Sequence, residues 1–340
     1  MSSLALLWVL AAAFAASAGT EFIRRQAVRL GVRDLPNERS SHTVPTPRGG
    51  GLAMVLVMLT AWVTLGFQGL IPWQWATALT AGGALTALVG GIDDLRSLSA
   101  RARLIAHLAA GLGMAVAFAA SHGAIHITPE ILLPAWAAPL FVVLFVVWFI
   151  NLFNFMDGID GIAGGQSAST CAVAAAICLA AHQPVTALCF ALLSAVSLGF
   201  LTRNWHPARI FMGDVGSGFM GFALAATSLF AEQQGGLALP LFALLSGTFV
   251  VDATYTLIRR LVAGEAVAQA HRDHAYQHAT QRGASHAKVA GGYIAVNLLW
   301  LAPLTWFGAN WPTWTPALIV IAFVPLVALC VRLRAGIRGG

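Results

Sequence analysis

The stretch that decides the fold is residues 135–165, AWAAPLFVVLFVVWFINLFNFMDGIDGIAGG. It begins with an apolar run of about 20 residues, the length that an α-helix needs to cross the hydrocarbon core of a bilayer. It ends in a short polar island of amides, carboxylates and glycines. Apolar runs and polar islands alternate in this way along the whole 340-residue chain. The pattern predicts a membrane protein of many spans, with its chemistry in the islands.

The composition supports this prediction. Hydrophobic residues make up 58% of the chain and charged residues 9%, whereas a soluble domain carries about 25% charged residues. Backbone groups cannot be left unpaired in lipid, so the spans must be helices. We predict an all-α, polytopic bundle of about eleven transmembrane helices that forms one integral-membrane domain over residues 1–340. The expected spans are approximately 2–20, 49–67, 75–92, 102–120, 135–155, 162–181, 184–202, 215–232, 237–258, 289–308 and 313–332.

The basic residues indicate which side of the membrane each gap faces. All 19 Lys and Arg residues fall in alternate gaps between the apolar runs, and the positive-inside rule assigns those gaps to the cytoplasm. An odd number of spans then places the N-terminus outside and the C-terminus in the cytoplasm. The net charge of +6 is dispersed over several gaps, so it does not indicate binding to nucleic acid, which would need a dense basic patch.

The polar island at residues 151–161 carries the sharpest chemical signal. Asn151 and Asn154 are one helical turn apart, so both amides face the same way. Asp157 and Asp160 continue the three-residue spacing. Oxygen ligands on a short turn suit a hard cation and a nucleotide. Four such groups at the end of a membrane span are difficult to explain by structure alone.

Two further islands carry acids. Asp93 and Asp94 are adjacent at the end of a predicted span, where their mutual repulsion calls for a cation such as Mg²⁺ or a basic partner. The alternative is a capped helix end that faces water. Asp214, within Gly213-Asp214-Val-Gly-Ser217, opens a span and has the alternative of an ordinary N-cap. On the same face as the other acids it becomes a candidate metal ligand.

Two basic loops accompany the acids. Arg48 precedes three glycines, which allow close approach to the backbone, although a solvated basic loop is an equal alternative. In the segment from His271 to His278, three histidines could share one helical face and bind zinc, or the face could be solvated. Arg272 beside His274 better suits the oxygens of a diphosphate. His107, inside a span, is predicted to be hydrogen-bonded within the bundle.

In order and spacing, these islands resemble those of the polyprenyl-phosphate N-acetylhexosamine-1-phosphate transferases, glycosyltransferase family 4. The resemblance covers essentially the whole chain, including the eleven-span topology. The residues Arg39-Ser-Ser-His42 look most like the bacterial branch that initiates O-antigen or related surface polysaccharides. The branch acting on the muramoyl-pentapeptide nucleotide typically has three consecutive histidines where this chain has His271-Arg-Asp-His274. The matching segments are 45–51, 93–94, 151–161, 213–217 and 271–277.

The resemblance implies a reaction and a site. A UDP-linked N-acetylated sugar and undecaprenyl phosphate would give undecaprenyl-diphosphate-sugar and UMP, on the cytoplasmic face of a bacterial inner membrane. A homodimer is compatible with the family. Asn154 and Asp214 would hold Mg²⁺, with Mn²⁺ as an alternative, and Asp160 would contact the uracil. The resemblance also implies catalytic acids and further substrate contacts: Asp93, Asp94 and Asp157 for the former, and Asn151, Arg48, Arg272 and His274 for the latter.

Other mechanisms and functions stay open at this stage. Direct attack by the acceptor phosphate and a covalent intermediate on an Asp are both compatible with the residues. A transporter with an acid-lined path would place acids near mid-span at broken helices, and only Asp252 approaches such a placement. An enzyme that transfers a phosphatidyl group from a CDP donor would need Ala-Arg in the motif that begins at Asp160-Gly161, and this chain lacks it. The sequence does not indicate the donor sugar.

Overall fold

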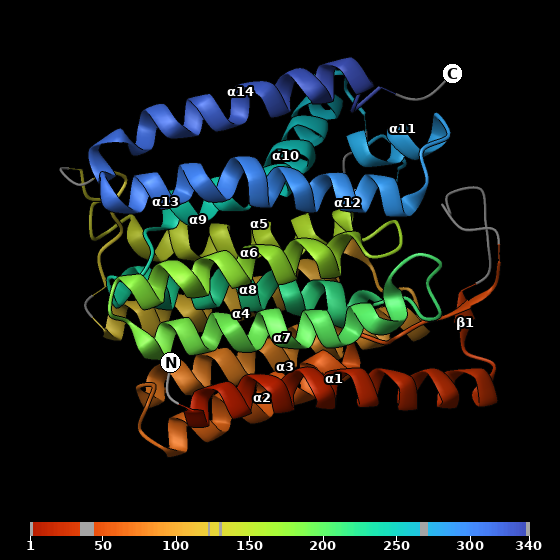
Figure 1. Cartoon of the computed structure of the whole chain (residues 1–340), viewed down its shortest axis with the longest axis horizontal. Coiled ribbons are helices and arrows are strands. Elements are labelled where there is room, and N and C mark those ends of the chain that lie inside the picture. The colour runs from red at the N-terminus through yellow and green to blue at the C-terminus, as the bar shows by residue number, and fades with distance from the viewer. Residues whose placement is uncertain (1–2, 35–43, 122, 129–130, 266–270, 338–340) are drawn as a thin grey trace.

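The computed structural model describes residues 3–34, 44–121, 123–128, 131–265 and 271–337, and the Arg39–His42 stretch lies outside them. Long helices run side by side through the molecule (Figure 1). Within the described residues, the only strands are the short antiparallel pair β1 (Arg33–Asp34) and β2 (Thr46–Pro47). The helices are α1 (Ser3–Leu30), α2 (Leu52–Phe67), α3 (Trp73–Leu95), α4 (Ala100–Ala120), α5 (Ala138–Met156), α6 (Ile162–Ala180), α7 (Pro184–Asn204), α8 (Asp214–Gln233), α9 (Leu239–Leu245), α10 (Gly247–Val262), α11 (Ala275–Gln281), α12 (His286–Val296), α13 (Ala302–Asn310) and α14 (Thr315–Leu333), with a π-helical turn η1 (Asn297–Leu301) and a 3₁₀ turn η2 (Pro312–Trp314).

The predicted all-α membrane fold is confirmed, because every predicted span falls on a helix or on a pair of helices. In the described part of the chain, nine helices are long and apolar enough to cross a membrane, and the pair α9–α10 makes a possible tenth. α2 is apolar but has only 16 residues. The start of α1 and the end of α14 lie at opposite ends of the bundle, and α11 and β1 share the end where the chain finishes (Figure 1).

Two of the predicted boundaries are wrong. α1 continues to Leu30, well past the expected end at residue 20, because Glu21 inside the helix pairs with Arg24 and Arg25 one turn later and with Arg203 of α7. The expected single helix over 237–258 is bent by 84° between α9 and α10. α10 therefore runs obliquely to the other helices (Figure 1). Hydropathy alone does not register such a break, because both halves are apolar.

α8 forms the centre of the bundle, and its first turn is held by close contacts between backbones. Nearly every side chain of α8 is buried. A Cβ added to Gly90 of α3 would lie 2.2 Å from the carbonyl oxygen of Asp214, and one added to Gly51 would lie 2.3 Å from the Cα of Gly216. Only glycine permits these approaches. The glycines thus bring the C-terminal end of α3 and the loop before α2 directly against the start of α8.

Candidate active site

Four of the predicted site residues line one small cavity of about 50 Å³ at the end of the bundle where α3 and α5 finish and α8 begins. Asp93 comes from α3, Asn151 and Asn154 from α5, and Asp214 from α8. Islands that are far apart in the sequence therefore converge on one point. The other residues that line the cavity are Thr86, Val89, Gly90, Arg103, His107, Phe155 and Gly218.

The N-terminus of α8 is capped by a carboxylate from another helix. The Asp94 side chain accepts hydrogen bonds from the backbone N–H groups of Asp214, at 2.9 Å, and Val215, at 3.1 Å. These are groups that the first turn of a helix leaves without an intrahelical partner, and a carboxylate there also complements the helix dipole. Asp94 therefore fixes the position of Asp214. Whether Asp94 also acts chemically stays a prediction.

Arg48 joins the two acids. Its Nε lies 2.8 Å from Asp94 Oδ1 and its Nη2 lies 3.0 Å from Asp214 Oδ1. Burial disfavours the charged guanidinium, but the carboxylates of Asp94 and Asp214 outweigh that cost and raise the pKa of Arg48 above its ordinary value. A fixed positive charge therefore stands beside the acids, where a phosphate group would need one.

The loop that carries Arg48 is anchored by backbone hydrogen bonds to the segment before α8. Phe211 N–H donates to the carbonyl of Pro47 at 2.8 Å, and the N–H groups of Gly50 and Gly51 donate to the carbonyls of Phe211 and Met212, both at 2.9 Å. This pairing explains the proline- and glycine-rich sequence of the first loop. The alternative that this part of the loop is merely solvated is wrong.

The oxygens of the cavity fit a hard cation. Asp93 accepts hydrogen bonds from Leu98 N–H at 2.5 Å and from Arg103 at 2.7 Å, so its carboxylate is held in place. The carboxyl groups of Asp93 and Asp214 lie close enough to interact with each other. With the amide of Asn154 in the same cavity, the donors are all oxygen ligands of the kind that Mg²⁺ prefers. Two neighbouring carboxyl groups are also stabilised by a divalent ion between them.

Asp157 and Asp160 follow immediately after α5, and their environments differ. Burial raises the pKa of Asp157 well above its ordinary value, and the nearby negative charge of Asp214 adds to this effect. At Asp160 burial acts in the same direction, but hydrogen bonds from His286, His206 and the backbone of Ala208 outweigh it and lower the pKa. The charged form of Asp160 is therefore stabilised, whereas that of Asp157 is disfavoured.

His206 and His286 are site residues that the sequence did not reveal. Nδ1 of His206 lies 2.7 Å from Asp160 Oδ2, and Nδ1 of His286 lies 3.4 Å from Asp160 Oδ1. They are 46 and 126 residues from Asp160 in the chain, so no local pattern connects them. The three ligand atoms lie within 4.8 Å of one another. This nitrogen-rich set suits a transition metal rather than Mg²⁺, which leaves the oxygen-lined cavity as the better magnesium site.

The predicted contact residue His274 is buried and caps α11. It forms a capping box with Gln277, in which each side chain bonds the backbone of the other residue. Because α11 begins only at Ala275, the expectation that three histidines share one helical face is wrong. His274 nevertheless lies close to the site, since its ring stacks at 6.3 Å on Phe155, which lines the cavity.

Asp252 of α10 holds the first turn of α11. Its carboxylate accepts hydrogen bonds from the N–H groups of Ala275, at 2.9 Å, and Tyr276, at 3.2 Å, and from the hydroxyl of Tyr293, at 2.7 Å. The hydroxyl of Tyr276 in turn donates to the carbonyl of Phe155 at 3.0 Å. The one acid that resembled a transporter residue is therefore a structural anchor between α10, α11 and α12.

Arg272 lies between these buried neighbours. Asp273, the next residue, forms an ion pair with the buried Arg260, which also pairs with Glu265 at 2.7 Å. The carbonyl of Arg272 accepts from the side chain of Gln281 at 3.1 Å. Arg272 itself is half-buried and lies within electrostatic reach of Tyr276. Its backbone is thus well held, and its contact with a diphosphate stays a prediction.

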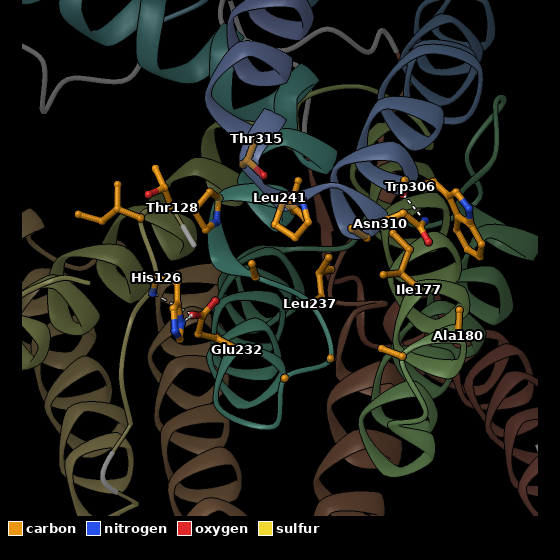
Figure 2. A pocket seen from close by; sticks show the side chains of 18 residues that line it. His126, Thr128, Ile177, Ala180, Glu232, Leu237, Leu241, Trp306, Asn310 and Thr315 are labelled. Carbon is orange, nitrogen blue, oxygen red and sulfur yellow. Dashed lines mark hydrogen bonds and ion pairs between the residues drawn. The ribbon is translucent and has the colours of Figure 1, made fainter. Parts of the chain in front are cut away.

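A larger cavity, of about 540 Å³, is at the opposite end of the bundle. Figure 2 shows His126 and Glu232 facing each other at its edge. Their side chains are 2.9 Å apart, and the other Glu232 oxygen accepts from Leu239 N–H at 2.6 Å at the start of α9. Glu232 is about 27 Å from Asp214 along α8, at 1.5 Å per residue. Glu232, the one acid among the described residues that line this cavity, is already paired, so the small acid-lined cavity is the better candidate active site.

Acids, amides and an arginine meet at one end of this α-helical membrane bundle. Such an arrangement is typical of a membrane enzyme that acts on phosphorylated substrates. Residues 76–232 match Glycosyl transferase family 4. The chain belongs to this family, the polyprenyl-phosphate N-acetylhexosamine-1-phosphate transferases.

Curated relatives agree with this assignment. A decaprenyl-phosphate N-acetylglucosaminephosphotransferase of Mycobacterium tuberculosis is 31% identical over 84% of this chain and 77% of its own length. A probable undecaprenyl-phosphate N-acetylglucosaminyl 1-phosphate transferase of Bacillus subtilis is 28% identical over 78% of this chain and 75% of its own. A phospho-N-acetylmuramoyl-pentapeptide-transferase of Picosynechococcus is 28% identical over 74% of this chain and 72% of its own length. The sequence resemblance is therefore confirmed at the level of the family.

Proposed function

We propose that the chain transfers an N-acetylhexosamine 1-phosphate from a UDP-sugar to undecaprenyl phosphate and releases UMP, at the cytoplasmic face of a bacterial inner membrane. The observation that carries this proposal is the convergence of Asp93, Asn154 and Asp214 on one cavity, beside the half-buried cation Arg48. Two phosphorylated substrates repel each other, and a reaction between them needs such a balance of charges. The family supports the general reaction, and the nucleotide, the lipid and the membrane face are parts of the proposal.

Magnesium is the cofactor that the donor set favours. Asn154 and Asp214 would hold the ion, with Asp93 beside them, and the bound ion would offset the negative charge of the reacting phosphates. Arg48 supplies a permanent positive charge next to that position, because its two ion pairs orient the guanidinium. Mn²⁺ has similar preferences for oxygen ligands and is the alternative.

The reaction forms one phosphoanhydride bond and breaks another. An oxygen of the acceptor phosphate attacks the phosphorus that bears the sugar, and the bond from that phosphorus to the oxygen of UMP breaks. The second pKa of a phosphate monoester is near about 6, so much of the acceptor is a dianion at neutral pH. We therefore favour direct attack over a covalent intermediate on an Asp. Asp157 lies within electrostatic reach of Asp214, Asp94 and Arg48, and in this proposal it supports that cluster.

We propose that the tail of the lipid binds in a cavity beside the bent pair α9–α10. This cavity of about 280 Å³, lined by apolar residues and His126, lies between α5 and the bent pair, with Phe145, Trp148 and Phe149 among its lining residues. Trp148 and Phe149 are within one helical turn of Asn151 in the polar cavity. A polyprenyl chain in the apolar cavity would therefore bring its phosphate to the acids.

The names of the relatives guide the choice of donor. Both the B. subtilis and the M. tuberculosis proteins are named for N-acetylglucosamine, so we propose UDP-N-acetylglucosamine as the first donor to examine. The absence of three consecutive histidines at 271–274 argues against the muramoyl-pentapeptide nucleotide. The product would begin an O-antigen or a related surface polysaccharide.

The test is release of UMP by membranes that contain the chain, given Mg²⁺, undecaprenyl phosphate and one UDP-sugar at a time. The panel comprises the UDP derivatives of N-acetylglucosamine, N-acetylgalactosamine, N-acetylfucosamine and N-acetylquinovosamine. We expect UMP with at least one donor, dependent on both the lipid and the ion. Release of no UMP from any donor, by protein that is shown to be folded, contradicts the proposal.

A further inference from the structure

His107 is a polar residue of the catalytic cavity to which no role has been assigned. It lines the cavity together with Asp93, Asn154 and Asp214, and it is 9% exposed. Its Nδ1 is buried and has no hydrogen-bond partner among the described residues. The sequence-based expectation that His107 is hydrogen-bonded within the bundle is therefore not met at this atom. A buried polar atom without a partner is costly, and because His107 also lines the cavity, a group that enters the cavity could satisfy its ring.

The cavity has a shallow layer and a deep layer. Asp93, Arg103, Asn154 and Asp214 lie close to the ends of their helices. His107 is four residues after Arg103 along α4, which places it about 6 Å deeper into the membrane at 1.5 Å per residue. By the same reckoning Thr86 and Asn151 are also in the deep layer.

Within the deep layer, the other two polar side chains are engaged by their own helices. The Thr86 hydroxyl donates to the carbonyls of Gly82 and Gly83, both at 3.0 Å. The Asn151 amide nitrogen donates to the carbonyl of Val147 at 2.7 Å. His107 is therefore the side chain in this layer that is best able to bind an incoming group.

The depth of His107 indicates which substrate it meets. A nucleotide-sugar is water-soluble and enters from the loop side, where Asp160, His206 and His286 lie. A lipid phosphate enters from the bilayer, because its tail stays in lipid. On the basis of the proposed function, we propose that the His107 imidazole binds the phosphate of the lipid acceptor and holds it on the membrane side of Asp93 and Asp214. Arg103, one turn above on the same helix, places a cation next to that phosphate.

Two substitutions test this role against a matched control. His107→Leu removes the ring nitrogens and keeps a side chain of similar bulk, whereas His107→Gln keeps a hydrogen-bonding group. The control is Thr227→Val in α8, because the Thr227 hydroxyl is also buried without a partner among the described residues but does not line the cavity. Thermal unfolding in detergent shows whether each variant is folded.

The first readout is binding of undecaprenyl phosphate by the purified chain without any donor. We expect His107→Leu to weaken this binding by about tenfold or more, as for a lost hydrogen bond to a charged group, and His107→Gln to recover part of it. Thr227→Val is expected to bind like the wild type. Unchanged binding by folded His107→Leu overturns the proposal.

The second readout separates the two substrates in turnover. We expect His107→Leu to raise the KM for undecaprenyl phosphate by about tenfold while the KM for the UDP-sugar changes less than twofold. Equal changes in both KM values overturn the assignment to the acceptor. Because the binding measurement needs no turnover, a wild type that binds the lipid but releases no UMP contradicts the proposed function and leaves the role of His107 to be decided by binding alone.

Discussion

Two groups of acids lie at the same end of this bundle, and they do different things. Asp93 and Asp214 face a cavity that they share with Asn154. Asp252 and Asp273 are instead surrounded by donors, the first by backbone N–H groups of α11 and the second by Arg260. Protein donors also hold Asp93 and Asp214, but these two acids line the cavity as well, so an ion that enters it can reach them. The comparison predicts where substitutions will affect turnover and where they will affect stability.

Substitution of a cavity acid is expected to have the largest effect on turnover. Asp214→Asn removes a charged ligand from the proposed metal site, and we expect UMP release to fall by at least about 10²–10³-fold, the cost of losing one group that stabilises the transition state. Insertion and thermal unfolding should change little, because the backbone N–H of residue 214 still donates to Asp94. UMP release measured in membranes checks this expectation.

A control at the other end of the same helix sharpens this prediction. Glu232→Gln changes an acid of α8 that lies beside the cavity of about 540 Å³ at the opposite end of the bundle and has no part in the proposed chemistry. We expect its UMP release to stay close to that of the wild type. If Asp214→Asn retains full activity, or if Glu232→Gln loses as much activity as Asp214→Asn, turnover does not depend specifically on the acids of the small cavity.

Substitution of Gly51, whose backbone contacts Gly216 at the start of α8, is expected to affect stability more than chemistry. In Gly51→Ala, the new methyl group would meet the Cα of Gly216 at 2.3 Å, and overpacking of this kind costs about 1–3 kcal/mol. The midpoint of thermal unfolding in detergent should fall. Gly113→Ala in α4 is the matched control, since nothing lies within 4 Å of its added methyl group. An equal midpoint for both variants would show that the backbones at Gly51 and Gly216 can move apart without loss of stability.

Substitution of a structural acid is expected to give the smallest effect of the three on turnover. Asp252→Asn keeps one acceptor oxygen but loses the charge that holds the N–H groups of α11, which we expect to lower stability by about 1–2 kcal/mol. Activity of the folded fraction should remain well above that of Asp214→Asn. Thermal unfolding and UMP release on the same preparation measure both quantities. Loss of activity without loss of stability would move Asp252 into the catalytic group.

The fold and the core of the site could be predicted because their signals are local. Apolar runs of span length determine the helices, and the three-residue spacing of Asn151 and Asn154 places both amides on the cavity side of α5. Asp157 and Asp160 keep this spacing in the sequence, but they follow the end of α5 and do not line the cavity. The bend of 84° between α9 and α10 could not be predicted, since hydropathy measures composition and not direction.

The parts of the site that depend on tertiary contacts also escaped prediction. Asp94 reads as a catalytic acid in the sequence, and only the structure shows that it caps a helix 120 residues later. His206 and His286 join Asp160 from distant segments. The sequence predicts that His107 is hydrogen-bonded within the bundle, because the missing partner of its Nδ1 is visible only in three dimensions.

The most direct measurement is titration of the purified chain with Mn²⁺, in place of Mg²⁺, followed by electron paramagnetic resonance, for the wild type, Asp214→Asn and Glu232→Gln. We predict one tightly held ion in the wild type and in Glu232→Gln, and loss of that ion in Asp214→Asn. Equal binding by all three proteins, or no bound ion in the folded wild type, would contradict a metal site built from the oxygens at the start of α8.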